Sequence, residues 1–292
     1  MFRAVDQPDR VATLKQHREG VGETLVLVHG ITATARGWLP VLPALAGHHD
    51  VIAVDLPGFG DSPPLADRIH PTAYAFADAI ERHLDGLGLA SVHLAGNSSG
   101  GWVALELARR GRARTVTAIA PLGLGTAREN RRARRRLGLV HSAAAVVGPV
   151  VPLIARFAAG RAMLGAITLG RPWRHNRAEM ATTARSLANS VGFRPALKWF
   201  TTNRAHGLEQ IDRPVTVLWG TRDRVLRSRQ AERFREQIPH AHVRVLRGLG
   251  HVPMTDDPDL VARAILETTA GARSTADGPS RAVAVPDSPD TA

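Results

Sequence analysis

The sequence predicts an α/β fold with a mostly parallel β-sheet, and three observations support this prediction. Segments of strand character alternate with helix-forming segments along most of the chain, as in proteins whose parallel strands are joined by helices. The segment 24–28 is apolar throughout, which is typical of a strand whose two faces are both covered. The chain has 292 residues, which is enough for one large domain or two modest ones.

Six strands and five helices are expected along the chain. The expected strands are 24–28, 51–55, 91–95, 115–120, 215–219 and 242–246. The expected helices are 38–46, 74–87, 99–109, 228–237 and 258–269. The last helix has the clearest start, because Asp257 is a suitable N-cap and Pro258 is favoured at the first helical position.

One long segment breaks the alternation of strands and helices. Between the fourth and fifth expected strands the sequence contains helix-forming and loop-forming stretches but no clear strand. We therefore expect a core domain formed by residues 1–125 and 211–270, with a helical cap at 126–210. Residues 271–292 are rich in Ala, Ser, Pro, Asp and Gly without apolar periodicity, and they are predicted to be a disordered tail.

The composition excludes several classes of site and partner. The chain has no cysteine, so it has no disulfide, no thiolate metal site and no cysteine nucleophile. Its net charge of +12 is high, but only two of its 38 basic residues are lysines, and aromatic residues make up 4%. Few rings are therefore available to stack on bases, and we do not expect nucleic-acid binding. Residues 1–20 contain no apolar signal segment, so a cytoplasmic location is expected.

The strongest functional signal is Gly96-Asn97-Ser98-Ser99-Gly100, a G-x-S-x-G motif. It lies between an expected strand and an expected helix, where a sharp turn needs small residues two positions before and after the serine. Such a turn presents the serine hydroxyl above the sheet, at the positive end of the following helix. Ser98 is therefore the predicted nucleophile.

A serine nucleophile needs a histidine base and a carboxylate that orients the histidine. His251 lies just after the last expected strand, and Asp223 lies just after the preceding one. Both positions are at the carboxyl edge of the sheet, where the serine turn also lies. The order Ser98, Asp223, His251 is one of the known chain orders of such triads. His93 lies within a strand and is expected to be a buried core residue.

Two backbone N–H groups are expected to stabilise the oxyanion of a tetrahedral intermediate. Ser99 N–H directly follows the nucleophile, and Ile31 N–H follows His29-Gly30 after the first strand. Another glycine-rich loop, 55–62, does not match G-x-G-x-x-G, and we interpret it as a structural turn near the pocket. No cluster of His, Asp and Glu has the spacing of a metal site, so neither a metal nor a cofactor is expected.

Together these motifs resemble those of the α/β-hydrolase superfamily. The matching motifs are His29-Gly30, Asp55–Ser62, Gly96–Gly101, Gly220–Asp223 and Gly250–Pro253. The resemblance covers about residues 23–125 and 211–268, whereas the cap between them matches no known pattern. It implies an eight-stranded, mostly parallel sheet flanked by helices, with a helical cap inserted after the sixth strand. It also implies a cofactor-free Ser-His-Asp mechanism with the acid after the seventh strand, in agreement with Asp223.

The predicted activity is hydrolysis of a carboxylic ester through an acyl-enzyme on Ser98, and the apolar cap suggests an uncharged or lipophilic substrate. Relatives that open epoxides or remove halogens use an aspartate nucleophile, which Ser98 disfavours. A carbon–carbon hydrolase of the meta-cleavage type stays an alternative, although Val252 stands where such enzymes tend to have an aromatic residue. Lactonase, acyltransferase and haloperoxidase activities use the same residues. A ligand-binding member of the fold without turnover is the other alternative.

A basic run beside an apolar stretch raises the question of a membrane. Residues 137–155 form a 19-residue stretch without Asp, Glu, Lys or Arg. A helix that spans a membrane needs about 20 residues, so the length of this stretch is nearly sufficient. A single span here would leave Ser98 and His251 on opposite sides of the bilayer, so we exclude it. Two interpretations remain, namely a cap whose arginines face water and a peripheral contact with anionic lipid. The arginines before the stretch are Arg131, Arg132, Arg134, Arg135 and Arg136.

Overall fold

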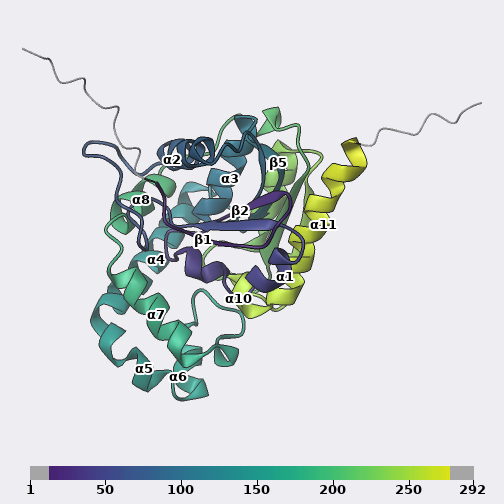
Figure 1. Cartoon of the computed structure of the whole chain (residues 1–292). Helices are drawn as coiled ribbons and strands as arrows, with labels where there is room; N and C mark the ends of the chain where they lie inside the picture. The colour runs from purple at the N-terminus through teal and green to yellow at the C-terminus, as the bar shows by residue number, and fades with distance from the viewer. Residues whose placement is uncertain (1–12, 277–292) are drawn as a thin grey trace, which may run out of the picture.

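The computed structural model describes residues 13–276, and these contain a seven-stranded β-sheet (Figure 1). The strands are β1 (Gln16–Glu19), β2 (Thr24–Val28), β3 (Asp50–Val54), β4 (Val92–Asn97), β5 (Ala113–Ile119), β6 (Val215–Gly220) and β7 (His242–Leu246). Their spatial order is β1-β3-β2-β4-β5-β6-β7. β1 runs antiparallel to β3, and every other neighbouring pair is parallel. The expected α/β fold with a mostly parallel sheet is therefore confirmed.

The number of strands differs from the eight that the family resemblance implies. The described residues form seven strands, so the helical insertion follows the fifth strand rather than the sixth. The strand that the apolar pattern missed is β1, whose sequence Gln-His-Arg-Glu contains no apolar residue. β1 lies at the edge of the sheet and pairs only with β3, and such edge strands are commonly polar.

Helices cover both faces of the sheet and produce two apolar cores. Those on one face are α2 (Ala73–Gly86), α3 (Ser99–Arg109) and α9 (Ala231–Gln237), and those on the other are α1 (Leu42–Ala46), α10 (Pro253–Asp256) and α11 (Pro258–Ala276) (Figure 1). Successive residues of β2 alternate between the cores, because Val26 and Val28 lie in the first while Leu25 and Leu27 lie in the second. Two covered faces explain why the strand is apolar throughout.

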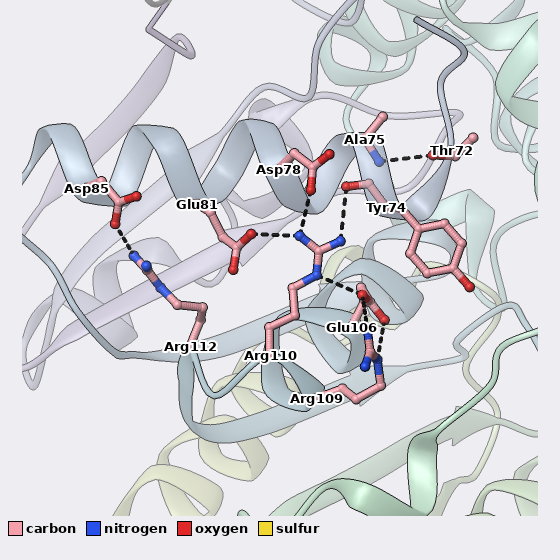
Figure 2. Close-up of polar contacts among 10 residues, drawn as sticks. All are labelled: Thr72, Tyr74, Ala75, Asp78, Glu81, Asp85, Glu106, Arg109, Arg110 and Arg112. Atoms are coloured by element: carbon pink, nitrogen blue, oxygen red, sulfur yellow. Dashed lines mark hydrogen bonds and ion pairs between the residues drawn. The ribbon is translucent and has the colours of Figure 1, made fainter.

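A network of ion pairs joins α2 to the end of α3 (Figure 2). Arg110 donates to Asp78 and Glu81 on α2 at 2.6 Å, and to the buried Glu106 on α3 at 2.7 Å. Arg109 donates to both oxygens of the same Glu106. Burial disfavours the charge of Arg110, but these carboxylates outweigh that effect and raise its pKa. The network fixes the far end of α3, whose first turn follows Ser98.

The segment between β5 and β6 is helical, as expected of the cap. Its elements are α4 (Ala127–Val147), η2 (Gly148–Val150), α5 (Val151–Ile154), α6 (Ala158–Leu164), η3 (Pro172–Arg174), α7 (Arg177–Ala188), α8 (Phe193–Phe200) and η4 (Leu208–Gln210). α8 packs on the core, where the rings of Phe200 and Trp102 are 5.4 Å apart. In Figure 1, α5, α6 and α7 project from one side of the molecule.

The helix predictions hold best in the first half of the core. α2 and α3 lie within one residue of the ranges 74–87 and 99–109. The expected helices 38–46 and 228–237 are each divided. The 3₁₀-helix η1 (Ala35–Trp38) precedes α1, and η5 (Ser228–Gln230) precedes α9.

The predicted start of the C-terminal tail is wrong. α11 continues through Ala276, so residues 271–276 are helical rather than disordered. This segment contains two alanines, and alanine favours helix even where the surrounding composition looks like a linker. The rest of the predicted tail, 277–292, lies outside the described residues.

Candidate active site

The G-x-S-x-G segment forms the sharp turn that its spacing predicts. β4 ends at Asn97 and α3 begins at Ser99, and Ser98 between them has φ 58° and ψ −116°. Few residues other than glycine adopt such angles, which require support from the surrounding structure. A Cβ atom at position 96 would overlap the carbonyl of Gly100, and one at position 100 would overlap the carbonyl of Val28. The two glycines are therefore needed for close backbone contact.

The structure brings the predicted acid and base together. His251 Nδ1 lies 2.8 Å from Asp223 Oδ2, and both side chains are buried. The other carboxylate oxygen of Asp223 accepts the N–H groups of Val225 and Leu226, each at 2.8 Å. With its orientation fixed in this way, Asp223 accepts the Nδ1 proton of His251 and leaves Nε2 as the basic nitrogen.

Ser98 is tied to the histidine loop through its neighbour Asn97. The Asn97 amide donates to the backbone carbonyl of His251 at 2.9 Å and to that of Ile119 at 3.2 Å. Among the described residues, no hydrogen bond joins Ser98 Oγ to His251. The contact between a catalytic serine and its base is often too long for a hydrogen bond until substrate binds. Sequence analysis assigned no role to Asn97, because the position before the serine in the motif carries no fixed residue type.

The two expected oxyanion donors differ in their hydrogen bonding. Ile31 N–H is not free, because it donates to Ser99 Oγ at 3.0 Å. Ser99 is fully buried, and none of the described residues accepts a hydrogen bond from its hydroxyl. Ser99 N–H is in the first turn of α3, where backbone donors lack intrahelical acceptors. Of the two expected donors, Ile31 N–H is therefore paired with the Ser99 side chain, and Ser99 N–H lies at the start of the helix.

His29 and Asp55 hold the neighbouring loops in place. His29 Nε2 accepts the N–H of Leu56 at 2.9 Å, and its Nδ1 lies 2.8 Å from Gly30 O, so the ring is neutral. Burial lowers the pKa of His29, which favours the same state. Asp55 accepts the N–H of Ala35 at 2.7 Å. These contacts support the interpretation of 55–62 as a structural turn.

Part of the cap is fastened to the loop that carries His251. His251 N–H donates to Thr168 O at 2.8 Å. The buried Asp256 accepts the N–H groups of Gly170, Arg171 and Gly250 at 2.7–2.9 Å. Burial alone would raise the pKa of Asp256, but these donors and the nearby His175 outweigh it and lower the pKa. Sequence analysis missed Asp256 and Thr168, since their partners are distant in the chain and a lone Asp or Thr carries no motif.

Comparison with known proteins identifies the family of the chain. The sequence pattern of the alpha/beta hydrolase family matches residues 25–264. The chain belongs to the α/β-hydrolase family. It is 34% identical over 213 residues to the epoxide hydrolase EphH of Mycobacterium tuberculosis, an alignment that covers 65% of this chain and 91% of EphH. The family membership makes the chain a hydrolase.

Solved structures of two other hydrolases superpose on this fold. A bacterial membrane phospholipase A has a TM-score of 0.71 at 25% identity, with 90% of this chain and 88% of that one covered. A thermophilic esterase from Thermogutta terrifontis has a TM-score of 0.70 at 23% identity, with 89% and 93% covered. The second likeness, at its low identity, shows the fold alone.

Proposed function

We propose that this hydrolase cleaves carboxylic esters through an acyl-enzyme on Ser98. The observation that carries the proposal is the buried 2.8 Å contact between Asp223 and His251, whose backbone is hydrogen-bonded to Asn97, the residue before a serine held in a strained turn. A carboxylate that fixes an imidazole, and a hydroxyl presented on a sharp turn, are the components of an activated serine. The imidazole removes the serine proton, and the carboxylate stabilises the imidazolium that forms.

The proposed reaction has two halves. In the first, Ser98 Oγ attacks the ester carbonyl while its proton moves to His251 Nε2, and the collapse of the tetrahedral intermediate transfers that proton to the departing alcohol. In the second, His251 removes a proton from water, which attacks the acyl-enzyme, and the carboxylic acid leaves with Ser98 regenerated. Asp223 stays ionised throughout.

Ser99 stabilises the oxyanion in this proposal with two donors. Its backbone N–H lies at the start of α3, where the helix dipole also favours negative charge. Its hydroxyl accepts from Ile31 N–H, so its own proton is free to point toward the oxyanion. Ile31 then acts through Ser99 by orienting and polarising that hydroxyl.

The nucleophile argues against epoxide opening, although EphH carries that name. A serine oxygen that opens an epoxide forms an ether, and a basic water molecule does not hydrolyse an ether under mild conditions. A carboxylate nucleophile would form an ester, which water can hydrolyse. Position 98 of this chain holds a serine, so its chemistry fits acyl transfer.

A panel of nitrophenyl esters of increasing acyl length, with one meta-cleavage ring-fission product included, tests the proposal. We expect turnover of the esters, labelling by a fluorophosphonate probe, and loss of both in Ser98→Ala. The matched control is Ser142→Ala, which removes an exposed serine of α4 and should change neither. Turnover of the ring-fission product alone would assign the carbon–carbon hydrolase activity. Folded protein that is neither labelled nor active would indicate a binding protein.

A further inference from the structure

The positive charge of the chain is concentrated in one part of the cap. Residues 127–178 contain eleven arginines and a single acidic residue, Glu129, and so carry +10 of the net charge of +12. Glu129 is itself engaged by Arg229 and Arg233 on the core, at 2.9 and 2.8 Å. The arginines are Arg128, Arg131, Arg132, Arg134, Arg135, Arg136, Arg156, Arg161, Arg171, Arg174 and Arg177.

Six of these eleven arginines lie on the first half of α4. Arginines alone line a surface hollow of about 390 Å³ there: Arg128, Arg131, Arg132, Arg135 and Arg136. The pKa of Arg136 is lowered, first by burial and then by the like charges of Arg132, Arg227 and Arg224, with only Asp223 opposing them. None of the five guanidinium groups forms an ion pair with a described residue, and a cluster of this kind favours a ligand with several negative charges.

The second half of α4 and the helices after it expose apolar side chains. At 3.6 residues per turn, Leu139 and Val146 lie on the same exposed side of α4 as Arg128, Arg132 and Arg135. Val146 is 79% exposed, and Phe157 before α6 is 65% exposed. Further exposed apolar side chains in this region are Val150, Leu153, Met163 and Trp173. Several large apolar side chains exposed on neighbouring elements favour a contact site.

By length and composition alone, Ala127–Ile154 could cross a membrane, with a mean hydropathy of 1.9 in its most apolar window. Only 28% of that window is buried, so it is unlike the core helix of a soluble protein. It does not span, because Asn97 before it and His251 after it are hydrogen-bonded to each other. The stretch is also divided, since η2 separates α4 from α5. The surface is therefore suited to lie on a bilayer rather than within it.

We propose that α4, α5 and α6 dock on the surface of an anionic phospholipid bilayer. The arginines of α4 bind lipid phosphates and carboxylates, while Val146, Leu153 and Phe157 enter the boundary between headgroups and acyl chains. Proteins that bind at a membrane interface combine positive charge with exposed apolar side chains on one face, and α4–α6 have both. This inference stands apart from the proposed ester chemistry, since it uses none of the active-site residues.

The first test measures cosedimentation with phosphatidylcholine vesicles with and without phosphatidylserine. The protein carries Ser98→Ala, so that lipid hydrolysis does not affect the result. We expect binding to vesicles that contain phosphatidylserine, little binding to pure phosphatidylcholine, and weaker binding at high salt. The variant Arg131→Gln/Arg132→Gln/Arg135→Gln should lower the partition coefficient about 100-fold, since each arginine near the surface contributes about fivefold.

A matched control removes the same charge elsewhere. Arg82→Gln/Arg247→Gln/Arg263→Gln replaces three exposed arginines of the core domain. We expect at most a few-fold change in partition, since these side chains lie outside the α4–α6 surface. If this control lowered binding as much as the α4 variant, net charge rather than the proposed surface would account for binding.

The second test addresses the apolar contact. Leu153→Ser/Phe157→Ser should lower partition at least tenfold, because each side chain loses part of its transfer free energy of about 1.5–3 kcal/mol. The control Val21→Ser/Ile69→Ser changes exposed apolar residues outside the cap and should have no effect. Trp173 is exposed, and its fluorescence should shift to shorter wavelength on binding.

Three results would overturn the proposal. The first is wild-type protein that stays in the supernatant with vesicles containing phosphatidylserine. The second is a failure of lipid specificity, in either of two forms. The protein could bind neutral vesicles equally well. Alternatively, polyphosphate or RNA could displace it from the vesicles, and its affinity for that polyanion could be the same in Leu153→Ser/Phe157→Ser. The third is a concentration-dependent dimer in analytical ultracentrifugation that the same apolar variant dissociates, because the surface would then be covered by a second copy.

Discussion

At the scale of single residues, Asp223 uses its two carboxylate oxygens for different purposes. Oδ1 is occupied by the N–H groups of Val225 and Leu226, so Oδ2 must face His251. Because the backbone N–H groups and His251 Nδ1 each require an acceptor oxygen, an amide side chain could satisfy only one of these two contacts. An amide oxygen would stay with the two N–H donors, and the amide nitrogen would then face Nδ1.

Asp223→Asn should therefore retain the fold and lower kcat about 10³- to 10⁴-fold, because the wrong tautomer of His251 would be stabilised. Steady-state kinetics on a nitrophenyl ester, with circular dichroism to verify folding, measures this. Asp212→Asn serves as the control, since Asp212 is exposed and its one ion pair among residues 13–276 is with its neighbour Arg213. Near-normal turnover of Asp223→Asn would mean that another acid orients the base.

Ser99→Ala separates two accounts of the oxyanion site. If the Ser99 hydroxyl is a donor, its removal should lower kcat about 100-fold with little change in KM. If Ile31 N–H is the true donor, the same variant would free that group from Ser99 Oγ and turnover would be retained or increased. Single-turnover kinetics of acylation discriminates the two, and unchanged acylation would reject the role given to the hydroxyl.

At the scale of elements, α3 is held at both ends by different means. Its first turn follows Ser98, the proposed nucleophile, and contacts β2, while its last turn is joined to α2 by the network around Arg110 (Figure 2). The network includes the buried carboxylate of Glu106, which needs its cationic partners. The fixed position of Ser98 thus depends in part on ion pairs at the far end of the helix.

Arg110→Met should lower the free energy of unfolding by about 1–2 kcal/mol, because hydrogen bonds to three carboxylates are lost and two of those carboxylates are partly exposed. Arg112→Met is the control, since Asp85, which is exposed, is the one carboxylate among the described residues that pairs with Arg112. Loss of this ion pair should lower the free energy of unfolding by less than about 1 kcal/mol. Urea denaturation measures both. Equal effects of the two variants would contradict the account of the network.

The sequence predicted the elements of the core because their signals are local. Continuous apolar runs marked β2 and β3, and the two glycines around Ser98 marked the turn. β1 was missed, since an edge strand needs no apolar run, and the end of α11 was misplaced because its alanines resemble a linker. The Ser99–Ile31 contact and the Asp256 contacts join residues far apart in the chain, so no local pattern could indicate them.

At the scale of the whole molecule, several buried histidines make stability depend on pH. His93 is the clearest case, because burial and then the nearby His49 lower its pKa to about 4. Its Nδ1 contacts Thr115 Oγ1 at 2.9 Å, and it is a core residue, as its position within a strand predicted. The unfolded chain binds this proton near pH 6.5, whereas the folded chain resists it until about pH 4.

The contribution of His93 to the free energy of unfolding should be complete above about pH 6.5 and should decrease as the pH falls to about 4, by up to about 3 kcal/mol. Urea midpoints across this range measure the loss. His93→Gln should reduce the slope, because a group with no titration replaces the imidazole. His240→Gln, at an exposed histidine, is the control and should leave the slope unchanged. A slope that His93→Gln does not alter would place the pH dependence elsewhere.

The contacts of Thr168 and Gly170 with the His251 loop limit which parts of the cap can be exchanged between related proteins during evolution. Backbone groups of 168–171 hold the imidazole loop, and a side chain on Gly250 would overlap Gly170. The α4–α6 portion makes no such bonds to that loop among the described residues. Recombination between related hydrolases could therefore exchange α4–α6 without breaking a hydrogen bond to the histidine loop, whereas any graft that replaced 168–171 would have to bring its own histidine loop with it.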